Sequence, residues 1–232
     1  ESDTAPYVCR KITSDRVVIW GVVPALGVGI FPSEHTPESL EPIARLFPGA
    51  VAYTDVLKAG LSALNPIVHP PGVLLNAGRV ERSRGDFYFY EEGVTPGVVT
   101  VIEALDRERL ALGAAYGIEL KPVAEGFANA GFGPRGDLWS VINGSLMLTA
   151  LRAPGQLNTR WLTEDLPYGL ATWTALAEPL GVGMPVARSL ITLGSALLCR
   201  DFGSECRDLE ALGIEGLTPE SLFRYLTTGV RS

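Results

Sequence analysis

The chain has 232 residues, a formal net charge of −7 and an isoelectric point near 4.9. Its basic residues are scattered, which argues against a nucleic-acid partner, because such binding needs a continuous positive stripe that neutralises phosphates. With 47% hydrophobic and 19% charged residues, the composition predicts a folded chain with a sizeable core and excludes a largely disordered one.

Cysteine usage and hydropathy predict a cytoplasmic protein. The three cysteines are an odd number without a C-x-x-C pair, a pattern more typical of a reducing compartment than of a secreted, disulfide-linked domain. No signal peptide is evident. The longest apolar run, residues 17–31, contains Pro24 and is shorter than the ~20 residues of a membrane span, so no membrane partner is expected. The first residue is Glu1, which predicts a fragment or a processed product.

The first third of the chain predicts strands followed by short helices. Residues 6–12, 16–23 and 25–31 are rich in β-branched and apolar side chains, as in buried strands. A helix is predicted after them, with Thr36 as its cap and a proline in its first turn. A second helix is expected at residues 54–64.

From about residue 65 the pattern becomes helical. Helices are predicted at residues 95–117, 137–151, 184–199 and 218–229, with Thr95 and Asp137 as caps and Gly117 as a stop. Residues 85–93 alternate and predict a short extended segment. The layout is therefore a strand-containing part of about 60 residues, packed against a mostly helical part of about 170.

Two apparent motifs are interpreted as incidental. "GFGPRG" at Gly131–Gly136 matches G-x-G-x-x-G, but no strand precedes it and Pro134 removes a backbone donor, so we interpret it as a loop between helices. Cys199 and Cys206 match no zinc spacing, and no metal site is expected. His35, beside a predicted helix start, is interpreted as a solvated loop residue.

Two further segments are candidates for chemistry. The first, "LNPIVHPP", contains His69, which alone is more typical of a satisfied core residue; Pro70 and Pro71 predict a rigid lead-in to a helix. The second, "NTRWLTEDLPYG", contains Arg160, whose guanidinium fork suits a carboxylate ligand. It also contains Asp165, a carboxylate able to orient a distant histidine. An internal ion pair between Arg160 and a neighbouring Glu or Asp fits the second pattern equally well.

The chain resembles the opine dehydrogenase family, which includes octopine and nopaline dehydrogenases. The segments "NPIVHPPGVLLNAG", "FYFYEEGVTPGVVTVIEALDRERLALGAAYG" and "NTRWLTEDLPYGL" carry the resemblance, which extends over nearly the whole chain. It implies an α+β, mainly α fold: strands remaining from a Rossmann-type domain at residues 1–63, packed on an all-helical domain at residues 64–232 that is similar to the C-terminal domain of 6-phosphogluconate dehydrogenase.

The resemblance also implies an activity and a site. The family reduces the imine formed from an α-keto acid, with pyruvate as the expected one, and an amino acid, using NAD or NADP cofactors. By resemblance, His69 is the catalytic proton donor and acceptor, Asp165 is its partner, Arg160 holds the keto-acid carboxylate, and Asn65 is a supporting polar group in the substrate site. The family's N-terminal Rossmann domain with its phosphate loop is missing from this sequence. A homodimer is left open.

Two alternatives remain. The chain is compatible with a non-catalytic helical dimerisation module derived from a dehydrogenase, because the phosphate loop is missing. It is also compatible with a reductase of another substrate, such as a ketopantoate-reductase-like enzyme. Those enzymes rely on a catalytic lysine, and Lys58 and Lys121 lie in no motif of that kind.

Overall fold

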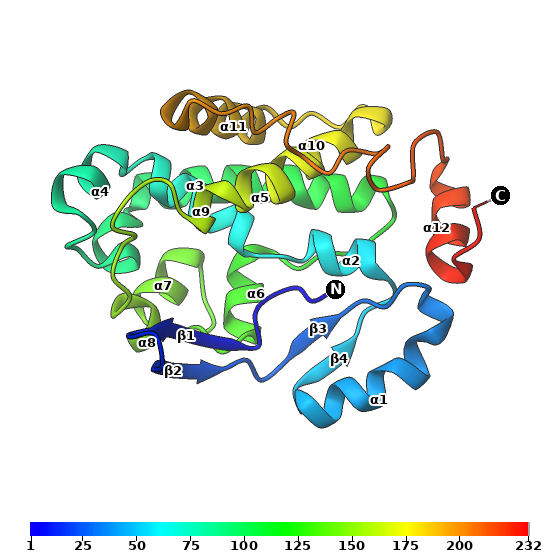
Figure 1. Cartoon of the computed structure of the whole chain (residues 1–232), viewed down its shortest axis with the longest axis horizontal. Helices are drawn as coiled ribbons and strands as arrows, with labels where there is room; N and C mark the ends of the chain where they lie inside the picture. The colour runs from blue at the N-terminus through cyan, green and yellow to red at the C-terminus, as the bar shows by residue number, and fades with distance from the viewer. Residues whose placement is uncertain (232) are drawn as a thin grey trace.

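A computed structural model describes residues 1–231 and confirms the α+β, mainly α fold class. Strands β1 (Tyr7–Lys11) and β2 (Val17–Val22) form an antiparallel hairpin. Strands β3 (Leu26–Val28) and β4 (Ala50–Ala52) pair in parallel, and helix α1 (Thr36–Leu46) connects them. Figure 1 shows these strands and α1 along the lower side of the molecule, with most of the other helices above them.

The remaining helices follow in chain order. Helices α2–α12 are Val56–Leu61, Asn65–Leu74, Ala77–Ser83, Pro96–Ala115, Val123–Asn129, Leu138–Asn143, Leu146–Thr149, Arg160–Thr163, Thr172–Ala177, Pro185–Leu198 and Pro219–Thr228. The 3-10 turns η1 and η4 are Ser33–His35 and Glu178–Leu180, and the π-helical turns η2 and η3 are Phe89–Gly93 and Asp165–Ala171. None of the helices in residues 1–231 is both long and apolar enough to cross a membrane.

Helix α5 is the centre of the core. Its apolar positions Ile102, Leu105 and Leu112 are fully buried, and their spacing of three and seven residues puts them on one face of a helix. Helices α3, α10 and α11 pack against α5, and Figure 1 shows them layered around it. The layer of α3, α5 and α11 therefore forms a rigid support for any side chain that these helices carry.

A buried ion pair ties α5 to its neighbours. Arg109, only 1% exposed, donates to the carboxylate of Asp106 at 2.7 Å and to the carbonyls of Leu61 and Lys121 at 2.8 and 2.6 Å. The second oxygen of Asp106 accepts the backbone N–H of Val123. Both charges are thus paired and hydrogen-bonded, which buried charges require.

A second buried carboxylate fixes the start of α11. Glu108 accepts the backbone N–H groups of Val186 and Ala187 at 2.7 and 3.0 Å. These groups have no partner within the helix, because the first turn of a helix leaves its N–H groups unpaired. Helix α11 in turn packs against η3 and α3, so Glu108 fixes one wall behind the segment that begins with Asp165.

The predicted lead-in to a helix at Pro70 and Pro71 was wrong. Both prolines lie inside α3, which begins at Asn65. Each proline lacks the N–H that would bond to the carbonyl four residues earlier, so it weakens the helix. The contacts of α3 with α5, α9 and η3 override this local preference.

Two other segments differ from the prediction. Residues 137–151 form two helices instead of one: Asp137 caps α7 as predicted, but Ser145 is extended and its hydroxyl accepts the N–H of Leu148 to start α8. Residues 85–93 contain the π-helical turn η2 instead of a strand, and only Tyr88 forms a bridge, with Arg152.

The predicted caps of two helices differ in detail. Thr36 is the first residue of α1 and donates its hydroxyl to the Ser33 carbonyl at 2.7 Å, because a 3-10 turn precedes the helix. Thr95 does stand at the N-cap of α5, but its side chain accepts no backbone N–H there. In both helices the proline of the first turn is where the sequence predicted it.

Candidate functional site

His69 and Asp165 meet where α3 packs against η3. The distance between His69 Nδ1 and Asp165 Oδ2 is 2.8 Å, and their side chains are 12% and 14% exposed. A carboxylate at this distance fixes the Nδ1–H tautomer of a neutral imidazole, so Nε2 is the nitrogen that remains for proton exchange. The two residues are 96 positions apart in sequence, and only tertiary packing brings them together.

Aromatic rings hold the imidazole from its face. The rings of His69 and Trp161 stack with centroids 4.3 Å apart and planes 4° from parallel. Phe89, from η2, contacts Trp161 edge-on at 4.6 Å. His69 is therefore fixed by a carboxylate at one nitrogen and by an indole against its plane, an arrangement that leaves its ring little freedom.

Two glycines permit the close packing around His69. A Cβ on Gly169 of η3 would lie 2.6 Å from Pro66 of α3, and a Cβ on Gly72 of α3 would lie 2.4 Å from the ring of Phe89. Both distances are below what real Cβ contacts allow, so larger residues at these positions would push the elements apart. The glycines are thus required for η3 and η2 to approach α3.

A cavity of about 800 Å³ opens beside this pair. Its wall includes Asn65 and Pro66 at the start of α3, Arg160 of α9, and Glu164 and Asp165 where η3 begins. His69 lies one turn further along α3 and is not part of the wall. Most of the remaining wall comes from residues 1–5, α2, η3, α10, the loop before α12 and α12 itself. Its size is typical of small-molecule sites.

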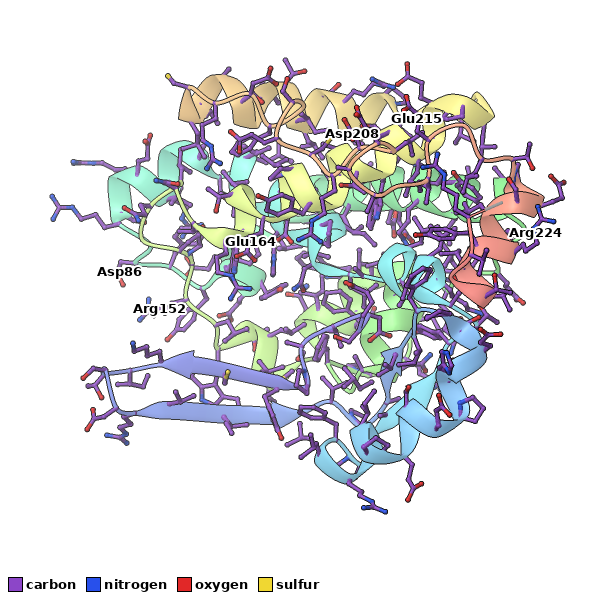
Figure 2. All side chains as sticks on the ribbon, turned by 45° about the vertical axis from the view of Figure 1, so that its right-hand side comes forward. Asp86, Arg152, Glu164, Asp208, Glu215 and Arg224 are labelled. Carbon is purple, nitrogen blue, oxygen red and sulfur yellow. The ribbon has the colours of Figure 1, made fainter. Side chains whose placement is uncertain are left out.

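Arg160 forms the internal ion pair that the sequence left open. Its Nε donates to Glu164 at 2.6 Å, and the hydrogen bond with Glu164 raises the pKa of the Arg160 guanidinium further above its usual range. The Arg160 side chain is 83% exposed and lines the cavity, so the ion pair leaves part of its fork open to a ligand. Figure 2 shows Glu164 on the ribbon that leads from α9 into η3.

The other candidate motifs lie apart from the cavity. His35 is exposed and bonds Glu38, and the three cysteines are free, with Cys9 and Cys199 exposed. Among residues 1–231, no group of three or more His, Cys, Asp or Glu side chains is placed to hold a metal ion.

Two glycine-containing segments do not form a nucleotide phosphate site. The loop Gly131–Gly136 follows helix α6 instead of a strand, and a Cβ on Gly133 would lie 2.0 Å from the Val141 carbonyl oxygen, so this loop packs on its own chain. The space beside the glycines of β3 and its end is occupied as well: Tyr53 and Asp3 lie against Gly27, and the backbone of Asp55 lies against Gly29. Neither segment therefore leaves the open backbone cradle that pyrophosphate needs.

Sequence reasoning missed the second arginine of the wall. Arg207, on the loop before α12, lines the cavity and its guanidinium lies 5.3 Å from the ring centroid of Tyr168. Nothing in the local sequence "SECRDLE" signals a site, because the loop reaches the cavity only through the packing of the chain's last 30 residues. The stack of Trp161 on His69 was not predicted from the sequence either.

Comparison with known proteins gives one family. A family model described as the alpha-helical domain of NAD/NADP octopine/nopaline dehydrogenase matches residues 52–198. The opine dehydrogenase of Arthrobacter sp. (strain 1C) is 31% identical over 218 residues, covering 94% of this chain and 60% of that protein. The vitopine synthase of Allorhizobium ampelinum is 30% identical over 222 residues, covering 94% and 61%. The chain therefore spans about three fifths of the length of these curated relatives.

Solved structures share the fold. Octopine dehydrogenase with NADH and L-arginine superposes with a TM-score of 0.71 at 18% identity, covering 100% of this chain and 64% of that one. Yersinopine dehydrogenase with NADP⁺ bound superposes with a TM-score of 0.66 at 15% identity, covering 97% and 64%. At these identities the likeness is one of fold alone.

Proposed function

The chain belongs to the NAD/NADP octopine/nopaline dehydrogenase family, and we propose that it is the substrate-binding, helical part of an opine-type dehydrogenase. The reaction is the NAD(P)H-dependent reductive condensation of an α-keto acid, with pyruvate as the first choice, and the amino group of an amino acid. The single observation that carries this proposal is the His69–Asp165 pair at 2.8 Å beside a cavity of about 800 Å³.

In this proposal His69 moves the proton. Asp165 holds Nδ1, so Nε2 gives a proton to the reacting nitrogen or carbonyl oxygen and takes one back in the reverse reaction. Asp165 also stabilises the imidazolium that forms while the proton resides on the ring. Trp161 keeps the imidazole plane fixed during both transfers.

Arg160 and Asn65 bind the keto acid in this proposal. Arg160 carries the permanent positive charge that a carboxylate needs, and its exposed fork lies on the cavity wall. Asn65 also lies on the wall and offers an amide that donates and accepts hydrogen bonds. The two side chains together orient the keto group toward the end of the cavity next to Asp165.

The nicotinamide cofactor belongs to another part of the proposed enzyme. Relatives of known structure were solved with NADH or NADP⁺, whereas neither the loop Gly131–Gly136 nor the glycines Gly27 and Gly29 leave an open phosphate cradle. We propose that residues 1–63 complete a dinucleotide-binding domain; the parallel pair β3–β4 with its crossover helix α1 supports this division.

The cytoplasm is the proposed compartment, in line with three free cysteines.

The test is an activity assay on the full-length gene product. Oxidation of NADH and of NADPH is followed at 340 nm with pyruvate and a panel of amino acids. We expect His69→Ala to lower kcat by about 10²–10⁴-fold, the usual contribution of a general acid or base. An undiminished rate in this variant contradicts the role given to His69.

The chain supplies its own matched control. His35→Ala removes the only other histidine, which is exposed and bonds Glu38, and should leave the rate unchanged. Asp165→Asn keeps the shape of the side chain but loses its charge, so we expect a smaller loss than in His69→Ala. A full-length protein that folds, forms oligomers and turns over no pair of the panel would favour the non-catalytic alternative.

A further inference from the structure

We propose that Arg207 is the counter-ion for the carboxylate of the amino-acid substrate, and that it thereby selects amino acids over simple amines. This inference rests on the proposed function, because it assigns the second carboxylate of that reaction. The condensation of a keto acid with an amino acid gives a secondary amine that carries two carboxylates. A single guanidinium, that of Arg160, matches only one of them.

Besides Arg160, the cavity wall offers one more cationic side chain to a ligand. Asp165 is bonded to His69, and Glu164 to Arg160. Asp3, the other acidic wall residue with a partner, accepts the hydroxyl of Tyr53 at 2.7 Å and the N–H of Gly27 at 3.1 Å. Arg207 lines the same cavity, and within residues 1–231 no carboxylate lies within ion-pair distance of it.

The acidic neighbour of Arg207 in sequence does not neutralise it. Asp208 accepts the backbone N–H of Ala211 at 2.8 Å and lines a separate hollow together with Glu178 and Glu215. Figure 2 shows Asp208 and Glu215 on the loop that precedes α12. The two side chains of the pair 207–208 therefore belong to different faces of this loop, and only Arg207 belongs to the cavity.

Tyr168 holds the Arg207 guanidinium in place. The guanidinium carbon lies 5.3 Å from the centroid of the Tyr168 ring, within the range of a cation–π contact. A planar guanidinium can stack on an aromatic face, and in that arrangement its edge, where the N–H donors point, is open to a carboxylate. The backbone N–H of Tyr168 is bonded to the Glu164 carbonyl at 2.9 Å, which links this support to the segment that carries Asp165.

The first experiment measures binding without turnover. Two probes differ by the amino-acid carboxylate alone: N-(1-carboxyethyl)norvaline has two carboxylates, and N-(1-carboxyethyl)butylamine keeps only the one derived from the keto acid. Calorimetry on the full-length protein should show that the wild type prefers the first probe, and that Arg207→Gln weakens its binding about tenfold or more, the scale of a hydrogen bond between charged groups. Binding of N-(1-carboxyethyl)butylamine should stay within about twofold.

The second experiment uses kinetics. Arg207→Gln should raise KM for the amino acid about tenfold or more and leave KM for pyruvate within about twofold, whereas Arg207→Lys should recover part of the loss by keeping the charge. Arg188→Gln is the matched control, since it removes an exposed arginine of α11 that lies outside the cavity wall. Thermal unfolding checks that each variant is folded.

The outcomes separate this inference from the proposed function. An unchanged affinity for the dicarboxylate in Arg207→Gln overturns the inference, as does equal weakening of both probes or a wild type that does not prefer two carboxylates. A wild type that binds the dicarboxylate through Arg207 but oxidises no NAD(P)H with any substrate pair keeps the inference and overturns the proposed function.

Discussion

The N-terminal hairpin of β1 and β2 and the helices around α5 bury their apolar side chains to very different degrees. In β2, Val17, Ile19 and Val22 are 56, 55 and 66% exposed, whereas Ile67 of α3 and Ile102 of α5 are fully buried. Apolar burial is the main favourable term in folding. The helical part therefore has its own apolar core, and the free energy of burial in this core stabilises the elements that carry His69 and Asp165. The hairpin instead presents apolar side chains that no other part of residues 1–231 covers.

The largest test of this comparison removes the buried anion of α5. Asp106→Ala leaves Arg109, which is 1% exposed, without its counter-ion, and breaking a buried ion pair from one side costs about 3–5 kcal/mol. We expect this loss in the free energy of unfolding, measured by urea denaturation. Asp86→Ala is the control, because the Asp86–Arg152 pair is exposed, as its labels in Figure 2 show, and such pairs contribute less than about 1 kcal/mol.

A matched isoleucine pair compares the two regions directly. Ile67→Ala should lower the free energy of unfolding by about 2–5 kcal/mol, because it opens a cavity in the core. Ile19→Ala, at a position that is 55% exposed, should change it by less than about 0.5 kcal/mol. Equal losses of unfolding free energy in the two variants would contradict the difference in burial between the hairpin and the helices. They would mean that the hairpin is covered in solution.

The smallest expected effect on stability is that of Tyr53, which lies between β4 and α2 and donates a hydrogen bond to Asp3. Burial, followed by the hydrogen bond and charge of Asp3, raises the pKa of Tyr53 from its ordinary 10.0 to about 12. A raised pKa favours the neutral phenol in the folded state. The contribution of Tyr53 to the free energy of unfolding is therefore complete below pH 10 and is lost as the pH rises from about 10 to about 12. The stability difference between wild type and Tyr53→Phe should shrink over this range, and a difference that stays constant in denaturation curves would contradict this.

Local signals in the sequence were sufficient to predict helices α1, α2, α5, α11 and α12 and the first three strands. The proline at the start of α5 and the Asp137 cap of α7 are such signals, because each acts within one turn of its own helix. The prolines of α3 show the limit of local reasoning. Their preference favours a helix start, but packing against α5 and η3 decides that the helix runs through them.

The residues of the site could not be predicted from local signals in the same way. His69 and Asp165 are 96 residues apart, and no spacing rule connects them; only the resemblance to a family did so. Arg207 was out of reach even of the resemblance, because its loop reaches the cavity through packing alone. Arg109, a residue type that is rarely buried, is in the core only because Asp106 lies one turn away and carbonyls from two other segments accept its remaining donors.

The two π-helical turns at the site make its geometry sensitive to chain length. A π turn bonds i to i+5 and so contains one residue more than an α turn, and each residue of an α-helix turns the chain by about 100°. Deleting one residue from η3 would rotate everything after it relative to Asp165, including Tyr168 and the cavity wall of α10. A single insertion or deletion in either turn would therefore change the relative orientation of several site residues at once.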